Sequence, residues 1–402
     1  MKGEPVSGIQ PSLLKWARES ANMTTADVAD SLKKPVALVD AWESGSDAPT
    51  YSQLETLAYD LYKRPLAMFF LPSPPNEPSP KAEFRSLPER DLAELNRETV
   101  LLIRKARAFQ LALDELFDGR SPAQAPLWRS ITLTPGRPIP PLASRVRVEL
   151  GLPFESQLLA NYGSDDEALK TWRHAIEARG IFVFKHTFKQ SDISGFCLRH
   201  AEFPVIMINN STTKTRQIFS LLHELAHILA DRSGISSFDE SKIDRLTPRE
   251  RAIEVYCNAV AAEMLVPAED FRAQIVQLPA NLEAASNDQF AALASRYHVS
   301  RAVILRRLLD GDRVSQNFYA TKTQEWDAQR AEKGSGGNYY ATQNAYLSER
   351  FLGEVLSRYA RRQLSREDAA DLVGIAPKNL SRLQDQFMQG FAARSTSSTQ
   401  TA

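Results

Sequence analysis

Cysteine is scarce in this 402-residue sequence, which contains only Cys197 and Cys257. The two lie far apart, in contexts that predict a strand and a helix respectively. Their spacing therefore indicates neither a disulfide framework nor a cysteine-based zinc site. We expect both to be ordinary packing residues.

Long apolar runs are missing, and the N-terminus MKGEPVSGIQ has neither the basic segment nor the hydrophobic stretch of a secretion signal. We therefore expect a cytoplasmic protein that does not enter a membrane. An excess of charge is missing as well, because Lys plus Arg and Asp plus Glu both total 49. No global electrostatic field then favours nucleic acid, and any DNA binding must depend on a local surface.

Proline clusters divide the chain, since proline disfavours regular helices and central strands. Together with a length that allows several domains, they predict five segments. These are a helical module at 1–72, a proline-rich linker at 73–87, a domain with a helical lead-in at 88–275, a helical C-terminal domain at 280–392 and a disordered tail at 393–402.

Apolar residues recur at helical spacing in most of the chain, whereas strand-like patterns are few. Helices are expected at about 88–118, 143–150, 165–179, 213–230, 248–264, 287–297 and 300–309. Three strands are expected at 180–185, 194–199 and 204–209. The sequence thus predicts an α+β fold that is mostly helical and has one small sheet.

The segment FSLLHELAHIL, residues 219–229, contains two histidines and a glutamate inside an apolar run. On a helix, His223 and His227 project from the same face and are spaced to bind one metal ion. Glu224 follows at the position of a general base, beside the metal. The alternative is a pair of packed histidines, but burying these polar groups without partners would cost several kcal/mol.

A metal site of this kind needs a third protein ligand, and the predicted helix PRERAIEVYCNAVAAEMLVP offers glutamates. Glu254 is the preferred ligand, because its helical neighbours are small or apolar and allow close packing against the histidine helix. Asn258 lies one turn further and could orient a ligating histidine through its ring N–H. Glu250 is the reserve ligand, since the first helical turn already favours a carboxylate there.

The segments RQIFSLLHELAHIL and IEVYCNAVAAEMLVP resemble the ImmA/IrrE family of metallopeptidases, as does DISGFCLRHAEFPVIMINNS before them. The resemblance covers roughly residues 140–270, with Val260 at a position where the family often has an aromatic residue. It implies a zincin-like (gluzincin) core that binds Zn²⁺ through His223, His227 and Glu254, with Glu224 as the general base. Candidates for stabilising the oxyanion are Tyr256, His186 and His200.

The N-terminal segment, in which WESGSDAPT ends the third helical pattern, is similar to helix-turn-helix modules of the Xre repressor class. That similarity implies binding to double-stranded DNA, and Lys33 and Lys34 are the residues placed to contact phosphate. The expected reading helix PVALVDAWE offers Asp40 and small apolar groups, however, so binding to a protein partner is the alternative. Two later stretches, FAALASRYHVSRAVILRRLL and REDAADLVGIAPKNLSRLQ, also have a helix, turn, helix pattern.

By resemblance, the expected function is a zinc-dependent regulatory endopeptidase that cleaves a repressor or another regulatory protein. One alternative is a transcriptional regulator or antitoxin that binds a partner such as a toxin, with secondary or no proteolysis. Another is a helical scaffold with a structural metal, although a purely structural site needs no base such as Glu224. A homodimer formed by the C-terminal helices would place two N-terminal modules on adjacent half-sites.

Overall fold

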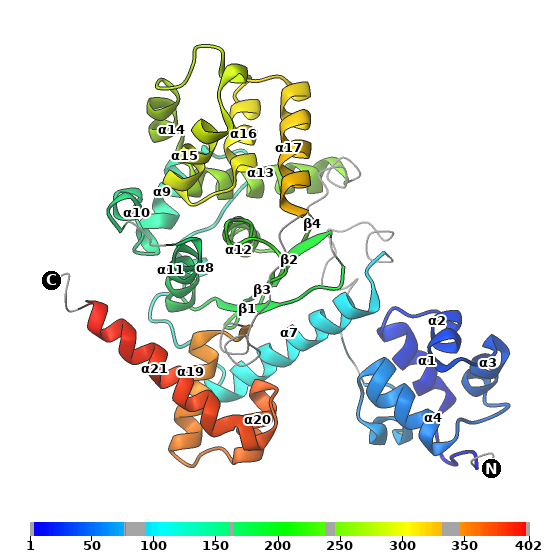
Figure 1. Cartoon of the computed structure of the whole chain (residues 1–402). Helices are drawn as coiled ribbons and strands as arrows, with labels where there is room; N and C mark the ends of the chain where they lie inside the picture. The colour runs from blue at the N-terminus through cyan, green and yellow to red at the C-terminus, as the bar shows by residue number, and fades with distance from the viewer. Residues whose placement is uncertain are drawn as a thin grey trace. The chain divides into compact units, whose positions relative to one another are not determined.

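The fold is described from a computed structural model in which residues 4–75, 77, 94–160, 164–190, 192–237, 246–331 and 346–398 are placed (Figure 1). The chain divides into two compact units, residues 1–107 with 188–191 and residues 108–187 with 192–402. The first unit thus extends past the boundary predicted at residue 72, and most of the predicted linker lies outside the described residues.

The first unit is helical, as its sequence predicts. Its elements are α1 (Pro11–Ser20), α2 (Thr25–Leu32), α3 (Val36–Ser44), α4 (Tyr51–Glu55), the π-helix η1 (Thr56–Tyr62), the 3-10 helix η2 (Leu66–Phe70) and the first part of α7 (Arg97–Leu116). Trp42 packs in its core at 2% exposure, and Gly45 ends α3 with a φ of 78°, a conformation that glycine adopts without strain.

The second unit contains the remaining helices. They are α8 (Leu127–Ser130), α9 (Ile139–Glu149), α10 (Phe154–Ala160), α11 (Asp165–Ala178), α12 (Lys214–Leu229), α13 (Pro248–Leu265), α14 (Ala268–Ile275), α15 (Asn287–Tyr297), α16 (Arg301–Asp310), α17 (Gln316–Ala331), α19 (Glu349–Ala360), α20 (Arg366–Val373) and α21 (Leu380–Ser398), with short 3-10 turns η4 (Leu282–Ala284) and η5 (Pro377–Asn379). No helix among the described segments is long and apolar enough to cross a membrane.

Four strands form one mixed sheet in the order β1-β3-β2-β4. They are β1 (Phe182–His186), β2 (Ile193–Leu198), β3 (Val205–Asn209) and β4 (Gly234–Ser237). β1 is parallel to β3, whereas β2 is antiparallel to both β3 and β4. The expectation of three strands was therefore one short, because β4 is only four residues long and its sequence GISS has no apolar alternation.

The sheet is covered on both faces, which places α12 in the centre of the unit (Figure 1). One face contacts α12, which in turn packs against α11 and α13. On the other side, Phe184 of β1 stacks on Phe109 of α7 with ring centroids 4.0 Å apart, and Phe351 of α19 meets both rings edge-on. α12 is therefore fixed between the sheet and α13.

Three helix boundaries differ from the predicted ones. α7 begins at Arg97, where Asn96 accepts a hydrogen bond from the Thr99 N–H, and residues 88–93 lie outside the described part of the chain. α9 begins at Ile139, because prolines are tolerated in a first helical turn. α21 continues to Ser398, into the segment expected to be disordered.

Candidate metal centre

α12 brings three polar side chains into a buried position. Its N-terminus is capped by Thr213, whose side chain accepts a hydrogen bond from the Arg216 N–H. Apolar residues then surround the motif, so that the helix buries more than one face. As a result His223, Glu224 and His227 are only 4%, 0% and 2% exposed.

α13 supplies the third carboxylate. Its first turn forms a reciprocal capping box, in which Glu250 accepts hydrogen bonds from the backbone N–H and the hydroxyl of Thr247 at 3.2 and 2.7 Å. The Glu250 carboxylate is thus used at the helix terminus, one turn before the metal centre. Glu254 lies on the side of α13 that faces α12, and its carboxylate reaches both histidines.

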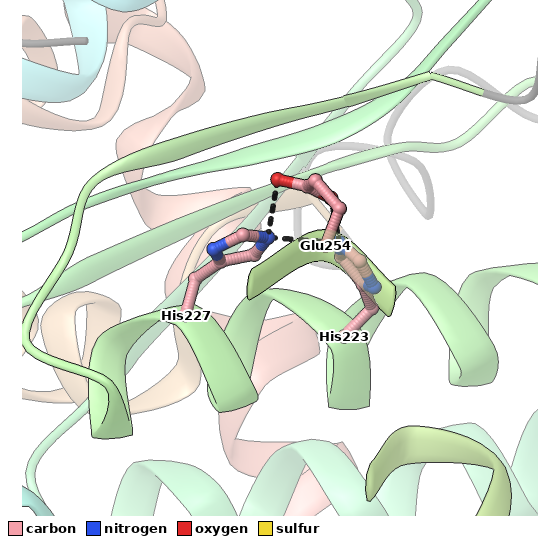
Figure 2. Close-up of side chains that lie close together, drawn as sticks. All are labelled: His223, His227 and Glu254. Carbon is pink, nitrogen blue, oxygen red and sulfur yellow. Dashed lines mark hydrogen bonds and ion pairs between the residues drawn. The ribbon is translucent and has the colours of Figure 1, made fainter. Parts of the chain in front are cut away.

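Figure 2 shows the three side chains pointing toward one another from the two helices. The Nε2 atoms of His223 and His227 are 2.9 Å apart. Glu254 places one carboxylate oxygen 3.3 Å from His223 Nε2 and the other 3.2 Å from His227 Nε2. Within the described residues, these ligand atoms form a group that could hold a metal ion, all lying within 4.8 Å of one another.

The donor set fits zinc. Two imidazole nitrogens and one carboxylate are the ligands of a catalytic zinc site that keeps an open fourth position. Burial opposes ionisation of Glu254, but the neighbouring His227 and His223 lower the pKa of its carboxyl well below the usual range. The Glu254 side chain is also more exposed, at 17%, than those of the histidines at 5% and 3%. The more exposed side of the cluster therefore carries an ionised carboxylate.

Glu224 lies beside this cluster and is held by the sheet. The Ser236 hydroxyl of β4 donates a hydrogen bond to Glu224 Oε1, whereas Oε2 is buried without a hydrogen-bond partner in the described residues. Burial raises the pKa of the Glu224 carboxyl, although the two histidines oppose that shift. A carboxylate with a raised pKa and one unpaired oxygen is suited to accept a proton.

Two glycines make room for the side of α12 that carries Glu224 and His227. A Cβ atom on Gly195 of β2 would approach the Met207 carbonyl oxygen to 2.9 Å and Glu224 Cγ to 3.6 Å. On Gly234 of β4 it would approach the His227 ring to between 3.0 and 3.2 Å. Sequence reasoning missed Ser236 and both glycines, since their role depends on strand pairings between residues distant in the chain.

We expect Gly234→Ala to reduce any catalytic turnover at this site by about tenfold or more, because the added methyl group displaces the His227 ring and small misplacements are costly in catalysis. Turnover per bound metal should be measured, with metal content determined in parallel. Gly311→Ala is the matched control, as a Cβ there meets nothing closer than 3.5 Å. Equal activity of the two variants would show that close contact at Gly234 does not position His227.

The hydrogen bond expected from Asn258 to a ligating histidine is not formed. The Nδ1 atoms of both His223 and His227 are buried and have no hydrogen-bond partner among the described residues. Asn258 is on α13 but is half-buried and makes no such contact. The ring orientation is instead restricted by packing, including the close approach of Gly234 to His227.

The oxyanion candidates separate clearly by position. His186 ends β1, the edge strand furthest from β4, and His200 Nδ1 accepts N–H bonds from Glu202 and Phe203 within a turn. Neither lies on the two helices that carry the metal ligands. Tyr256 lies on α13 two residues after Glu254, and its hydroxyl is buried without a partner in the described residues. Of the three, only Tyr256 shares a helix with a metal ligand.

Lys33 and Lys34 belong to the other unit and form the turn between α2 and α3. Both are exposed, and Lys33 adopts a left-handed conformation with a φ of 54°. Their contact with phosphate stays a prediction.

A pocket of about 430 Å³ opens at the C-terminal end of α12 and the first turns of α13, and no metal ligand lines it. It is bounded by residues 132–135, by Ala230 and Arg232 after α12, and by Arg249 and Ile253 of α13. Ile253 directly precedes Glu254, and the Arg232 N–H donates to the His227 carbonyl oxygen at 3.0 Å. The pocket thus adjoins the ends of both ligand-bearing helices.

A helix with the His-Glu-x-x-His order, closed by a glutamate from a second helix, defines a site of the two-histidine, one-glutamate metallopeptidase class. Comparison with known proteins agrees with this class. The family model of peptidase M78, described as the IrrE N-terminal-like domain, matches residues 176–309. The chain therefore carries a domain of the ImmA/IrrE metallopeptidase family.

Two individual proteins match parts of the chain. Over 71 residues the chain is 44% identical to the radiation response metalloprotease IrrE of Deinococcus deserti, a match that covers 17% of this chain and 24% of that protein. The chain thus spans about a quarter of that relative's length. A solved structure of a Mycobacterium tuberculosis transcriptional regulator aligns with 42% of this chain and 46% of its own, at 18% identity and a TM-score of 0.28.

Proposed function

We propose that this protein is a zinc-dependent endopeptidase and that its substrate is a repressor or another regulatory protein. The observation that supports this most directly is the Glu224 carboxylate, which is fully buried beside the His223, His227 and Glu254 cluster and has one unpaired oxygen. A site that only stabilised the fold would require the three ligands but no base.

Zinc, when bound by these three residues, would polarise the scissile carbonyl and acidify a water molecule. Glu224 takes the proton of that water at Oε2, because Oε1 is already engaged by Ser236. The raised pKa of the carboxyl lets Glu224 hold this proton and then deliver it to the leaving amine. Ser236 fixes the carboxylate through both steps.

The surroundings of the cluster favour an extended peptide as the substrate. β4 is an edge strand, so its outer side has no partner strand among the described residues and could pair with an extended chain. The pocket between residues 132–135 and the first turns of α13 offers space for a side chain. Regulatory use is supported by the match to a radiation response metalloprotease and by the helical units attached to the domain.

The test is to incubate the zinc-loaded full chain with the repressor-like or toxin-like proteins encoded beside its gene. We expect one of these proteins to be cut at one exposed loop, with the new termini identified by intact mass. A chelator should stop cleavage and added zinc should restore it. If every neighbouring regulator stays intact and zinc changes nothing while a regulator binds tightly, the protein is a partner-binding regulator instead.

A further inference from the structure

Three parts of the chain have the same local structure, although they lie in different regions of the fold. Each has a buried alanine, a residue with left-handed backbone four positions later, and a buried aliphatic residue six positions after that. The three sets are Ala29, Lys33 and Val39; Ala294, His298 and Ile304; and Ala370, Gly374 and Leu380. The alanine lies on a first helix and the aliphatic residue on the element that follows the turn.

The turn chemistry is also shared. In each set the N–H that follows the left-handed residue donates to the alanine carbonyl: Lys34 to Ala29 at 2.9 Å, Val299 to Ala294 at 3.0 Å and Ile375 to Ala370 at 3.0 Å. Each first helix begins at a hydroxyl cap, namely Thr24, Ser286 and Ser365. A tight turn that joins two helices in this way is the helix-turn-helix arrangement.

In the second of these helix pairs, α15 and α16, basic side chains of the second helix contact neighbouring residues. α16 packs against α17 (Figure 1). The Arg301 guanidinium lies 4.7 Å from the centroid of the Trp326 ring. Arg307 donates to Glu263 at 2.6 Å, and Arg306 pairs with Asp310 at 2.7 Å. Arg301, Arg306 and Arg307 are therefore already engaged by aromatic or acidic side chains.

The first helix pair, α2 and α3, has a surface that is poorly suited to binding nucleic acid. From Pro35 to Ser44 its second helix contains Asp40 and Glu43 and no basic residue. Glu43 forms an ion pair with Arg18 at 2.7 Å, and Asp40 is exposed. An exposed carboxylate on the helix that would enter the groove opposes approach to the phosphates.

The third helix pair, α20 followed by η5 and α21, has exposed acidic residues on α20, namely Glu367, Asp368 and Asp371, but its second helical element begins with basic side chains. Lys378, Ser381 and Arg382 are exposed at the start of its second helical element, and Asn379 between them is half-buried. Only Asp385 is acidic from residue 377 to residue 389. Arg366 at the start of α20 reaches this surface, because its guanidinium donates to the Ser381 hydroxyl at 3.5 Å. Lysine and arginine contact phosphates, and arginine, asparagine and serine are side chains that contact base edges.

The third helix pair also packs against α19. α19 packs against α20, and a Cβ on Gly353 of α19 would approach the Phe387 ring of α21 to 3.3 Å. Leu380 and Leu383 are buried on the inner side of α21, at 0% and 3% exposure. The helix is therefore held by its apolar face while the side with Lys378 and Arg382 remains outward.

We propose that α20 and α21 form a helix-turn-helix unit that binds double-stranded DNA, with residues 378–382 entering the major groove. Lys378 and Arg366 contact phosphate, and Asn379, Ser381 and Arg382 face the base edges. This inference does not depend on the peptidase activity, and it assigns duplex binding to the C-terminal region rather than to Lys33 and Lys34.

The experiment uses the full chain and a fluorescein-labelled duplex of about 30 base pairs and mixed sequence, because phosphate contacts bind any sequence. Anisotropy is measured over a range of salt concentrations for the wild type and for Lys378→Ala with Arg382→Ala. We expect this pair to weaken binding at low salt about tenfold and to make the log–log salt dependence shallower by about one to two.

Three further variants make the result decisive. Arg272→Ala with Arg313→Ala removes the same charge from exposed positions outside the three helix pairs and should leave duplex binding unchanged. Lys378→Arg with Arg382→Lys keeps the charge and should keep the salt dependence. Lys33→Gly with Lys34→Ala removes the two basic residues in the turn of the first helix pair, so that its duplex binding can be compared directly with that of the Lys378 and Arg382 variant.

Wild-type salt dependence in the Lys378 and Arg382 variant would overturn the proposal. Absence of duplex binding by the wild type at low salt would also overturn it and assign the surface to a protein partner.

Discussion

Glu224→Gln should bind zinc as tightly as the wild type and yet cleave the substrate at least about a hundredfold more slowly, the usual loss for a general base. The amide is nearly isosteric with the carboxylate, and Oε1 can still accept the hydrogen bond from Ser236. It cannot take a proton at the position of Oε2, however. The measurement is single-turnover cleavage of the identified substrate with zinc content determined on the same samples.

Two controls separate the chemistry from simple disturbance of the helices. Glu250→Gln changes a carboxylate on α13 that serves only the capping box, so its cleavage rate should stay near that of the wild type. Ser236→Ala should give an intermediate rate, because it frees the Glu224 carboxylate without removing it. Equal cleavage by the wild type and Glu224→Gln would contradict the peptidase proposal and favour a regulator that binds its partner.

The helices of the site could be predicted because their signals are local. α12 and α13 have threonine caps, and the apolar spacing within each predicts a helix at nearly the observed bounds. The choice of Glu254 over Glu250 also followed from helix position. The capping box observed at Thr247 gives the physical reason for it, because that carboxylate already satisfies a helix terminus.

The sheet side of the site could not be predicted, because it depends on pairings that bring distant residues together. β4 is too short and polar to be recognised alone, and it becomes a strand by pairing with β2. Only this pairing brings Ser236 to Glu224 and Gly234 to His227. The Asn258 expectation failed for a related reason, since position on a helix face does not fix which atoms a side chain reaches.

Replacing the third ligand, Glu254→Ala, should lower zinc affinity by more than about a hundredfold. This loss exceeds the one usual for residues that only hydrogen-bond to a metal ligand. Without the carboxylate, His223 and His227 are left as two buried imidazoles with their Nε2 atoms 2.9 Å apart. Two nitrogen donors from one helix cannot complete a site that requires three protein ligands. Competition titration with a coloured chelator measures the affinity, and elemental analysis should find about one zinc per wild-type chain.

Glu250→Ala is the matched control for this prediction, because it removes a carboxylate four residues away on the same helix. It should retain zinc and lose only about 1 kcal/mol of stability through the capping box. The opposite pattern, with zinc kept by Glu254→Ala and lost by Glu250→Ala, would require α13 to rotate and unwind its first turn. The two variants thus decide between ligands that share one helix, and the outcome depends on the carboxylate that already faces both histidines.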